Sequence, residues 1–185
     1  MILVVCLGLG IALRVVSGNT IGDLQRIHVF GETWLVAVLC VQGLLPLVRL
    51  TGVSAHAAYG LWLVTFPLLI AIAWRNRSQP GMPLVVVGLL FNMLVVSLNG
   101  GMPVMATAAA AAGLQGQLAI PVGDFVHVVG GSATRLPWLA DTIPLAAAPV
   151  SRLVPSAGDL LLYAGVVVFI AGARASTQKT KRRTE

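Results

Sequence analysis

The stretch VSLNGGMPV, residues 96–104, decides how this chain is divided. An apolar run ends there on Asn99, and two glycines and a proline follow within four residues. Glycine adopts the left-handed conformation that ends many helices, and it lets another segment come close. Pro103 cannot continue the same helix, because proline lacks the backbone N–H that the helix needs. We therefore expect one helix to end at Asn99 and a differently folded segment to begin.

Composition places this boundary in a membrane protein. The chain has 185 residues, of which 57% are hydrophobic and only 10% are charged. A soluble domain of this size carries roughly 25% charged residues, so lipid must cover much of this surface. The formal net charge is +6, but the basic residues gather between apolar runs and in the tail. That pattern indicates membrane topology and excludes a nucleic-acid patch.

Five apolar runs are long enough to cross a bilayer. The last four correspond to about 24–28 Å of helix at ~1.5 Å per residue, close to the ~30 Å of the hydrocarbon core. The runs are continuous rather than alternating, which favours helices over strands. The predicted fold is therefore all-α, a polytopic integral membrane bundle of five transmembrane helices within one domain, residues 1–173. The predicted spans lie near residues 1–16, 33–50, 56–74, 83–99 and 158–173.

The basic residues predict the orientation. Nine of the 12 lysines and arginines fall on one side of the five spans and three on the other. The positive-inside rule makes the larger group cytoplasmic. The N-terminus is then outside, and the basic tail, residues 174–185, is cytoplasmic and faces anionic headgroups.

Residues 100–157 form the segment between the fourth and fifth spans, outside the membrane in this topology. The segment holds six of the chain's 10 prolines, and its apolar content stays high. A free loop of this composition would expose apolar side chains to water and tend to aggregate. We expect a structured, partly re-entrant cap on the outer ends of the helices, with a short helix in MATAAAAAGL, residues 105–114.

Polar residues are expected to converge under this cap. Asn92 and Asn99 are seven positions apart and share a helix face. His127 and Asp141 lie in the cap, and Asp159 lies at the start of the last span. Acidic groups beside a low-dielectric cavity are candidates for function, and Asp141 and Asp159 are the candidate catalytic pair. The predicted ligand-binding residues are Asn92, Asn99, Gly100, Gly101, His127, Asp141 and Asp159.

Each of these side chains also has an ordinary structural interpretation. Ser156 and Asp159 have the spacing of a capping box at a helix start. Asp141 could stabilise a local turn or pair with Arg135. Asn92 could join two helices by hydrogen bonds.

Metal and cofactor chemistry is not expected. Cys6 and Cys40 lie inside apolar runs, which indicates unpaired thiols, and a single histidine such as His127 is usually structural. The sequence contains no metal-ligand spacing, phosphate loop, haem motif or nucleophile elbow. The GLGLG near the start lies inside a span without the strand–helix unit of a dinucleotide site.

Several of these residues resemble a known bacterial family, the domain-of-unknown-function family numbered 5317. The likeness rests on Asn92 followed by NGGMPV (99–104), on LADTIP (139–144) and on SAGDLL (156–161), with Gln42 in the second span. It covers nearly the whole chain, although no aromatic residue stands between glycine and methionine in NGGMPV. The resemblance implies a small multi-pass protein of the bacterial cytoplasmic membrane and no assigned reaction.

Three functions are compatible with these patterns. The first is binding of a lipid, a small solute or a membrane partner through the polar cluster at the outer face. The second is a membrane-embedded hydrolase that uses Asp141 and Asp159 as an acid/base pair. The third is a small transporter subunit, although no inverted repeat is visible. The patterns favour binding over catalysis, with the lipid bilayer and a second copy of the chain or another membrane protein as partners.

Overall fold

The computed structural model describes residues 2–45, 47, 52–114, 126–147 and 151–173. Within these ranges the chain is mainly helical, with six α-helices and two short sheets. A 3-10 helix, η1 (Ile21–Arg26), follows the first helix. The five longer helices are α1 (Ile2–Val16), α2 (Glu32–Leu44), α3 (Ala55–Arg75), α4 (Met82–Asn99) and α6 (Ala157–Gly172).

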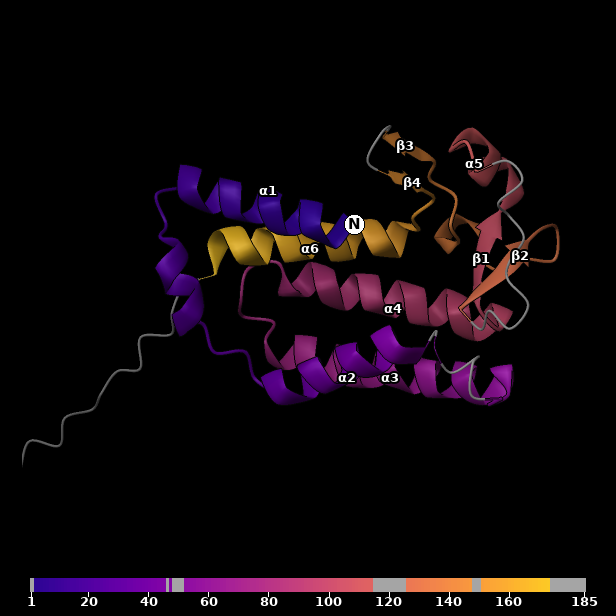
Figure 1. The fold of residues 1–185 in the computed structure, drawn as a ribbon, viewed down its shortest axis with the longest axis horizontal. Coiled ribbons are helices and arrows are strands. Elements are labelled where there is room, and N and C mark those ends of the chain that lie inside the picture. The colour runs from indigo at the N-terminus through magenta and orange to yellow at the C-terminus, as the bar shows by residue number, and fades with distance from the viewer. Residues whose placement is uncertain (1, 46, 48–51, 115–125, 148–150, 174–185) are drawn as a thin grey trace, which may run out of the picture.

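The five longer helices lie side by side, and the short strands gather at one end (Figure 1). Helix α6 comes last in the sequence but lies between α1 and α4, and α3 and α2 follow on the far side of α4. The N-terminal end of α6 and the C-terminal end of α4 therefore meet at the end that carries the strands.

Local signals explain where these helices begin and end. The Ser54 side chain accepts a hydrogen bond from the Ala57 backbone N–H at the start of α3. Gly81 is left-handed directly before α4, and a proline occupies the first turn, where its missing N–H costs little. Gly100 ends α4 with φ 73°, so the left-handed cap predicted from the sequence is confirmed.

The segment 100–157 contains strands that the all-α prediction lacked. Strands β1 and β2 are parallel, with Met102 opposite His127, and β3 and β4 are antiparallel. The helix cannot continue through the glycines and Pro103, so the freed backbone groups pair with a distant part of the chain. The elements of this segment are β1 (Met102–Met105), α5 (Ala106–Ala111), β2 (His127–Gly130), the 3-10 helix η3 (Pro137–Leu139), β3 (Leu145–Ala147) and β4 (Ser151–Leu153).

Four of the five predicted spans coincide with helices to within about two residues at each end. Helix α2 ends at Leu44, earlier than the predicted limit of residue 50. By length and composition, α3 and α4 could cross a membrane, whereas the apolar parts of α1, α2 and α6 are shorter. The predicted tail, 174–185, lies outside the described residues, as do residues 115–125 and 148–150 of the predicted cap.

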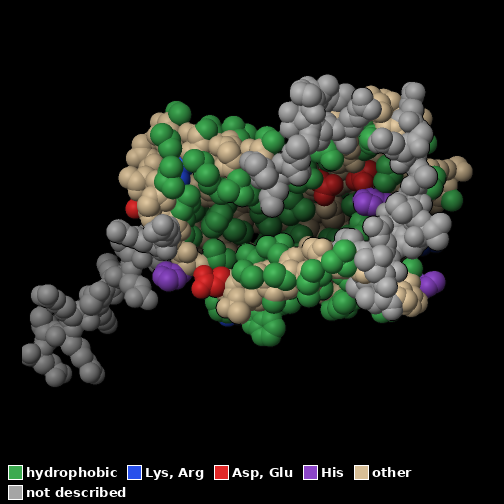
Figure 2. All heavy atoms as spheres, viewed as in Figure 1, with side chains coloured by type: hydrophobic (Ala, Val, Ile, Leu, Met, Phe, Trp, Pro, Cys, Tyr) green, Lys and Arg blue, Asp and Glu red, His purple; other side chains and the backbone are tan. Residues whose placement is uncertain are grey.

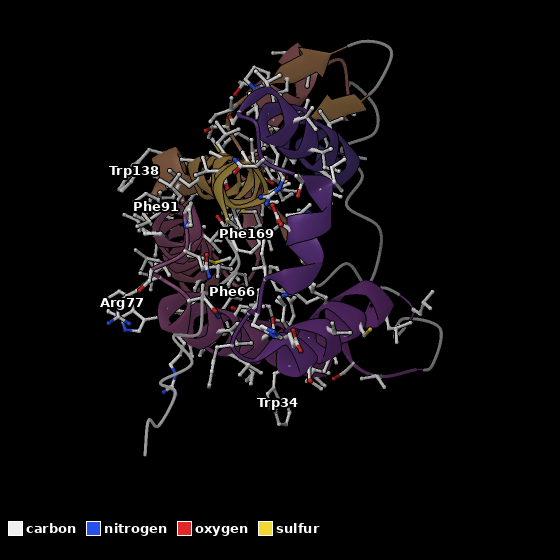
Figure 3. The ribbon with its side chains drawn as sticks, turned by 90° about the vertical axis from the view of Figure 1, so that its left-hand side faces the viewer. Trp34, Phe66, Arg77, Phe91, Trp138 and Phe169 are labelled. Atoms are coloured by element: carbon white, nitrogen blue, oxygen red, sulfur yellow. The ribbon has the colours of Figure 1, made fainter. Side chains whose placement is uncertain are left out.

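Buried apolar side chains hold α3 and α4 together. Phe66, Val86 and Leu89 form one cluster between these helices, and Val95 packs with Leu139 of η3 nearer the strands. Figure 3 shows Phe66 among the helices, whereas Trp34 of α2 points away from them and is 65% exposed. The core therefore lies along α4, and large apolar side chains also remain on the outside of the bundle.

Candidate functional site at the start of α6

Paired glycines bring α4 and α6 into backbone contact. Gly88 faces Gly158, and Gly81 faces Gly165, and the two glycines of each segment are seven positions apart. A Cβ added at Gly88 would come within 2.6 Å of the Gly158 carbonyl oxygen, closer than real side chains allow. Small residues at such positions let two helices approach closely. The sequence alone does not pair these glycines, because the pairing depends on which two helices are neighbours.

Asn92 continues this line of contacts, one helical turn after Gly88. Its Nδ2 donates to Asp159 Oδ1 at 2.7 Å, and its Oδ1 accepts from Ser156 Oγ at 3.1 Å. The Asn92 side chain is only 6% exposed. The prediction that Asn92 joins two helices is therefore confirmed, and its partners are the first residues of α6.

Asp159 also caps its own helix. The Ser156 backbone N–H donates to Asp159 Oδ2 at 3.2 Å, and the Asp159 N–H donates to Ser156 Oγ at 3.0 Å. This is the capping box expected from the sequence. Both carboxylate oxygens of Asp159 therefore accept hydrogen bonds, one from Asn92 and one from Ser156.

The backbone of Asp141 is held against β1. Its N–H donates to the Pro103 carbonyl at 2.9 Å, and its carbonyl accepts from the Met105 N–H at 3.1 Å. Asp141 thus pairs in parallel with Val104. Gly101 helps to position β1, because a Cβ there would lie 2.8 Å from Val128 Cγ1. The close approach predicted at Gly101 is confirmed.

The side chain of Asp141 is the unusual feature of this region. It is 7% exposed, and its Oδ1 has no hydrogen-bond partner among the described residues. Desolvation raises the pKa of this carboxyl to about 8, and the negative charge of Asp159 adds to the effect. Asp141 and Asp159 are therefore brought within electrostatic reach of each other, as the sequence analysis expected. The ion pair allowed between Asp141 and Arg135 does not form, since no bond within the described residues joins them.

The Asn99 side chain was expected in the polar cluster with the acids, and its hydrogen bonds go to the backbone of Val95 and Arg135. Its Nδ2 donates to the carbonyls of Val95 (2.7 Å) and Arg135 (3.0 Å), and its Oδ1 accepts from the Arg135 N–H at 2.8 Å. These bonds fix the turn before η3 onto the end of α4. Asn99 also borders a pocket of about 370 Å³, formed with Pro103, Val128, Val129 and residues 131–134. None of these residues is an acid.

His127 stands at the start of β2 and is half-buried. Its register opposite Met102 places it at the sheet that holds Asp141, so the cap brings both to the same end of the molecule. Tyr163, which the sequence analysis missed, lies four residues after Asp159 and hence on the same face of α6. It is within electrostatic reach of Asp141, Asp159 and Cys6. The signal for Tyr163 was its i,i+4 spacing from an acid.

A hollow adjoins the acids. Figure 2 shows it over α6 and α4, between α1 and α2, lined mainly by apolar side chains. We call this hollow the apolar groove. Acidic side chains and a histidine lie at its end nearest the strands (Figure 2). Within the described part of the chain, no group of three or more His, Cys, Asp or Glu could hold a metal ion.

The comparisons with known proteins identify a family. Residues 26–171 match the family described as "Family of unknown function (DUF5317)", so the chain belongs to that family and the resemblance is confirmed. A protein of Thermotoga maritima named "Uncharacterized protein" is 31% identical over 123 residues, which are 64% of this chain and 67% of that protein. No solved structure shows a significant match.

Proposed function

We propose that this member of the family is an integral membrane protein that binds the polar end of an amphipathic ligand beside Asp141. The single observation that carries the proposal is the buried Oδ1 of Asp141, which has no hydrogen-bond partner in the described part of the chain. A buried polar atom without a partner costs about 1–3 kcal/mol, so a fold keeps one where a ligand supplies the missing bond.

The exposed apolar side chains support a membrane setting. Val16 is 85% exposed, Val64 is 68% exposed and Trp34 is 65% exposed. Water would penalise so many apolar side chains, whereas lipid tails would not. We propose five crossings, with α1, α2 and α6 as short spans beside α3 and α4, and with the segment 100–157 outside.

Cysteine labelling tests this topology. Ser132 and Ser78 are both exposed and lie in turns at opposite ends of the bundle. Each is replaced by cysteine in a chain whose Cys6 and Cys40 are changed to serine. A membrane-impermeant maleimide added to intact cells should label Ser132→Cys, and Ser78→Cys only after lysis. Labelling of Ser78→Cys in intact cells would reverse the orientation, and labelling of both would refute the spans.

Binding is favoured over hydrolysis by the contacts of Asp159. Both of its oxygens already accept hydrogen bonds, from Asn92 and from the Ser156 backbone. A hydrolase of the paired-aspartate kind needs two carboxyls that share a proton and activate a water. Because these structural hydrogen bonds occupy Asp159, Asp141 is the carboxyl that is available to a ligand.

Native mass spectrometry of the purified protein tests the binding function. The wild-type protein, extracted from its own membrane in lipid nanodiscs, should retain a small molecule or lipid that survives release from the disc. Asp141→Asn should lose it, because the amide changes both charge and hydrogen-bonding capacity. Asp23→Asn, a neutralised acid in η1 at the other end of the bundle, is the matched control and should retain it. Equal occupancy in wild type and Asp141→Asn would refute the function.

A further inference from the structure

Two acids lie near the start of α6, and no described lysine or arginine side chain pairs with them. Asp141 and Asp159 are within electrostatic reach, and the proximity of Asp159 disfavours a charge on Asp141. No lysine or arginine within the described residues forms an ion pair with either acid. Buried acids are usually paired with a cation, so a positive charge is the component that the described residues do not supply here.

The missing hydrogen bond at Asp141 Oδ1 further restricts the chemical group that a ligand can present to it. Asp141 Oδ1 is an acceptor when the carboxyl is ionised, and it therefore needs an N–H or O–H donor. A primary ammonium group supplies both the charge and three donors. A quaternary ammonium supplies charge without a donor. A bound metal would need more ligands than these two carboxyls provide, and no larger cluster exists in the described residues.

We propose that the ligand is an amphipathic primary amine whose ammonium group binds Asp141, close to the negative charge of Asp159, and whose apolar chain lies in the apolar groove. This inference rests on the proposed binding function and names its ligand class. Two sources share the chemistry: the ethanolamine headgroup of a membrane lipid, and a free long-chain amine.

Tyr163 fits the same ligand. It is within electrostatic reach of both acids, and Cys6 of α1, which borders the groove, is also close to it. An aromatic ring beside an ammonium group adds a cation–π attraction, and the phenol oxygen can accept a hydrogen bond. The ring would thus lie where the charged end of the ligand meets its apolar chain.

The test compares a lipid with a primary ammonium, a lipid with a quaternary ammonium, a lipid without nitrogen and a free long-chain amine. The purified protein is placed in nanodiscs of phosphatidylcholine to which phosphatidylethanolamine, phosphatidylglycerol or dodecylamine is added, and retained molecules are counted by native mass spectrometry. We expect retention of phosphatidylethanolamine or dodecylamine above that of phosphatidylcholine and phosphatidylglycerol. Preference for the ethanolamine lipid identifies a headgroup site, and preference for dodecylamine identifies a free amine. Asp141→Asn should weaken retention by about tenfold or more, as for loss of one charge-assisted hydrogen bond.

The remaining outcomes distinguish this inference from the proposed function. If phosphatidylglycerol or phosphatidylcholine is retained as well as the amines, and Asp141→Asn abolishes that retention, the binding function stands and the amine is refuted. If no retention depends on Asp141, both are refuted. Tyr163→Leu, which keeps both acids, should weaken retention less than Asp141→Asn does. Circular dichroism of each variant checks that the helices remain folded.

Discussion

A buried ionisable side chain lies near each end of α6, and the two differ in their hydrogen bonds. At the C-terminal end, Arg14 is 1% exposed, and its guanidinium donates to the carbonyls of Thr20 (2.8 Å), Ile170 (3.0 Å) and Ala173 (2.8 Å). At the N-terminal end, Asp141 is 7% exposed and has an oxygen without a partner among the described residues. Both groups are ionisable and buried, but Arg14 makes three side-chain hydrogen bonds, whereas Asp141 Oδ1 makes none to the described residues.

This difference separates a structural charge from a functional one. Arg14 donates to carbonyls at the end of α6 that have no partner within the helix, and the helix dipole favours a cation there. Its three hydrogen bonds satisfy the buried guanidinium without a ligand. Asp141 lies near the acid that caps the start of α6, where the nearest charge repels it. The fold therefore tolerates an incomplete site at one end and stabilises the other end fully.

Removing Arg14 should have the largest effect on stability. Arg14→Leu leaves the last carbonyls of α6 without a donor, and we expect a loss of about 3 kcal/mol in the free energy of unfolding. The measurement is unfolding in mixed micelles followed by circular dichroism. Arg77→Leu is the control, because Arg77 is exposed and its side chain contacts the carbonyl and the ring of the nearby Trp74, and it should cost about 0.5 kcal/mol or less. Equal losses would mean that the Arg14 contacts do not stabilise α6.

Asn92→Leu should weaken the acidic end by about 2 kcal/mol, since it leaves Asp159 Oδ1 and Ser156 Oγ without their partner. Ser97→Ala on the exposed side of α4 loses only a bond to the Met93 carbonyl and is the matched control. The same unfolding assay applies. If the Asn92 variant is as stable as the Ser97 variant, Asn92 is not the main link between α4 and α6 at this end.

Stability should fall as pH rises, and Asp141 should cause the fall. Its pKa is raised from 3.8 to about 8, so between these values the folded protein holds one proton more than the unfolded chain. The stabilisation is therefore complete below 3.8 and is lost through about pH 8, with a slope of about 1.4 kcal/mol per pH unit. Unfolding measured at several pH values should show this slope in the wild type and a flatter one in Asp141→Asn. A flat wild-type profile would refute the shifted pKa.

Two asparagines make equivalent contacts at opposite ends of the bundle, and their substitution should have the smallest effects on stability. Asn76 exchanges hydrogen bonds with the Phe30 backbone (2.9 and 3.0 Å), as Asn99 does with Arg135 (2.8 and 3.0 Å). Substitution by alanine should cost about 1 kcal/mol for Asn99 and slightly more for Asn76, which is more deeply buried. Unfolding of the two variants side by side checks the order. A larger loss for Asn99 than for Asn76 would contradict the expected order.

The sequence predicted the features that depend on short stretches of chain. The apolar runs located the long helices, the Ser156–Asp159 spacing predicted the capping box, and Gly100 predicted the end of α4. Such signals act within one or two helical turns, so they can be interpreted without knowing the tertiary fold.

The features that depend on distant pairing were not predicted. The parallel pairing of β1 with β2 joins residues 25 positions apart, as Met102 and His127 show. Asn99 was placed in the polar cluster because it shares a helix face with Asn92, but its partner is Arg135. Arg14 counted in the sequence only as one of the basic residues that indicate topology, since two of its three carbonyl partners lie more than 150 residues away. Each of these depends on which elements become neighbours, which local patterns do not encode.

Infrared difference spectroscopy of the Asp141 carboxyl tests the account most directly. The wild-type spectrum minus that of Asp141→Asn, recorded in ligand-free nanodiscs over a range of pH, isolates this one group. The account predicts a protonated carboxyl band at neutral pH that disappears at about pH 8, and that also disappears at neutral pH when an amphipathic primary amine is added. A carboxylate that is already ionised at about pH 5, as an ordinary solvated aspartate is, would contradict it.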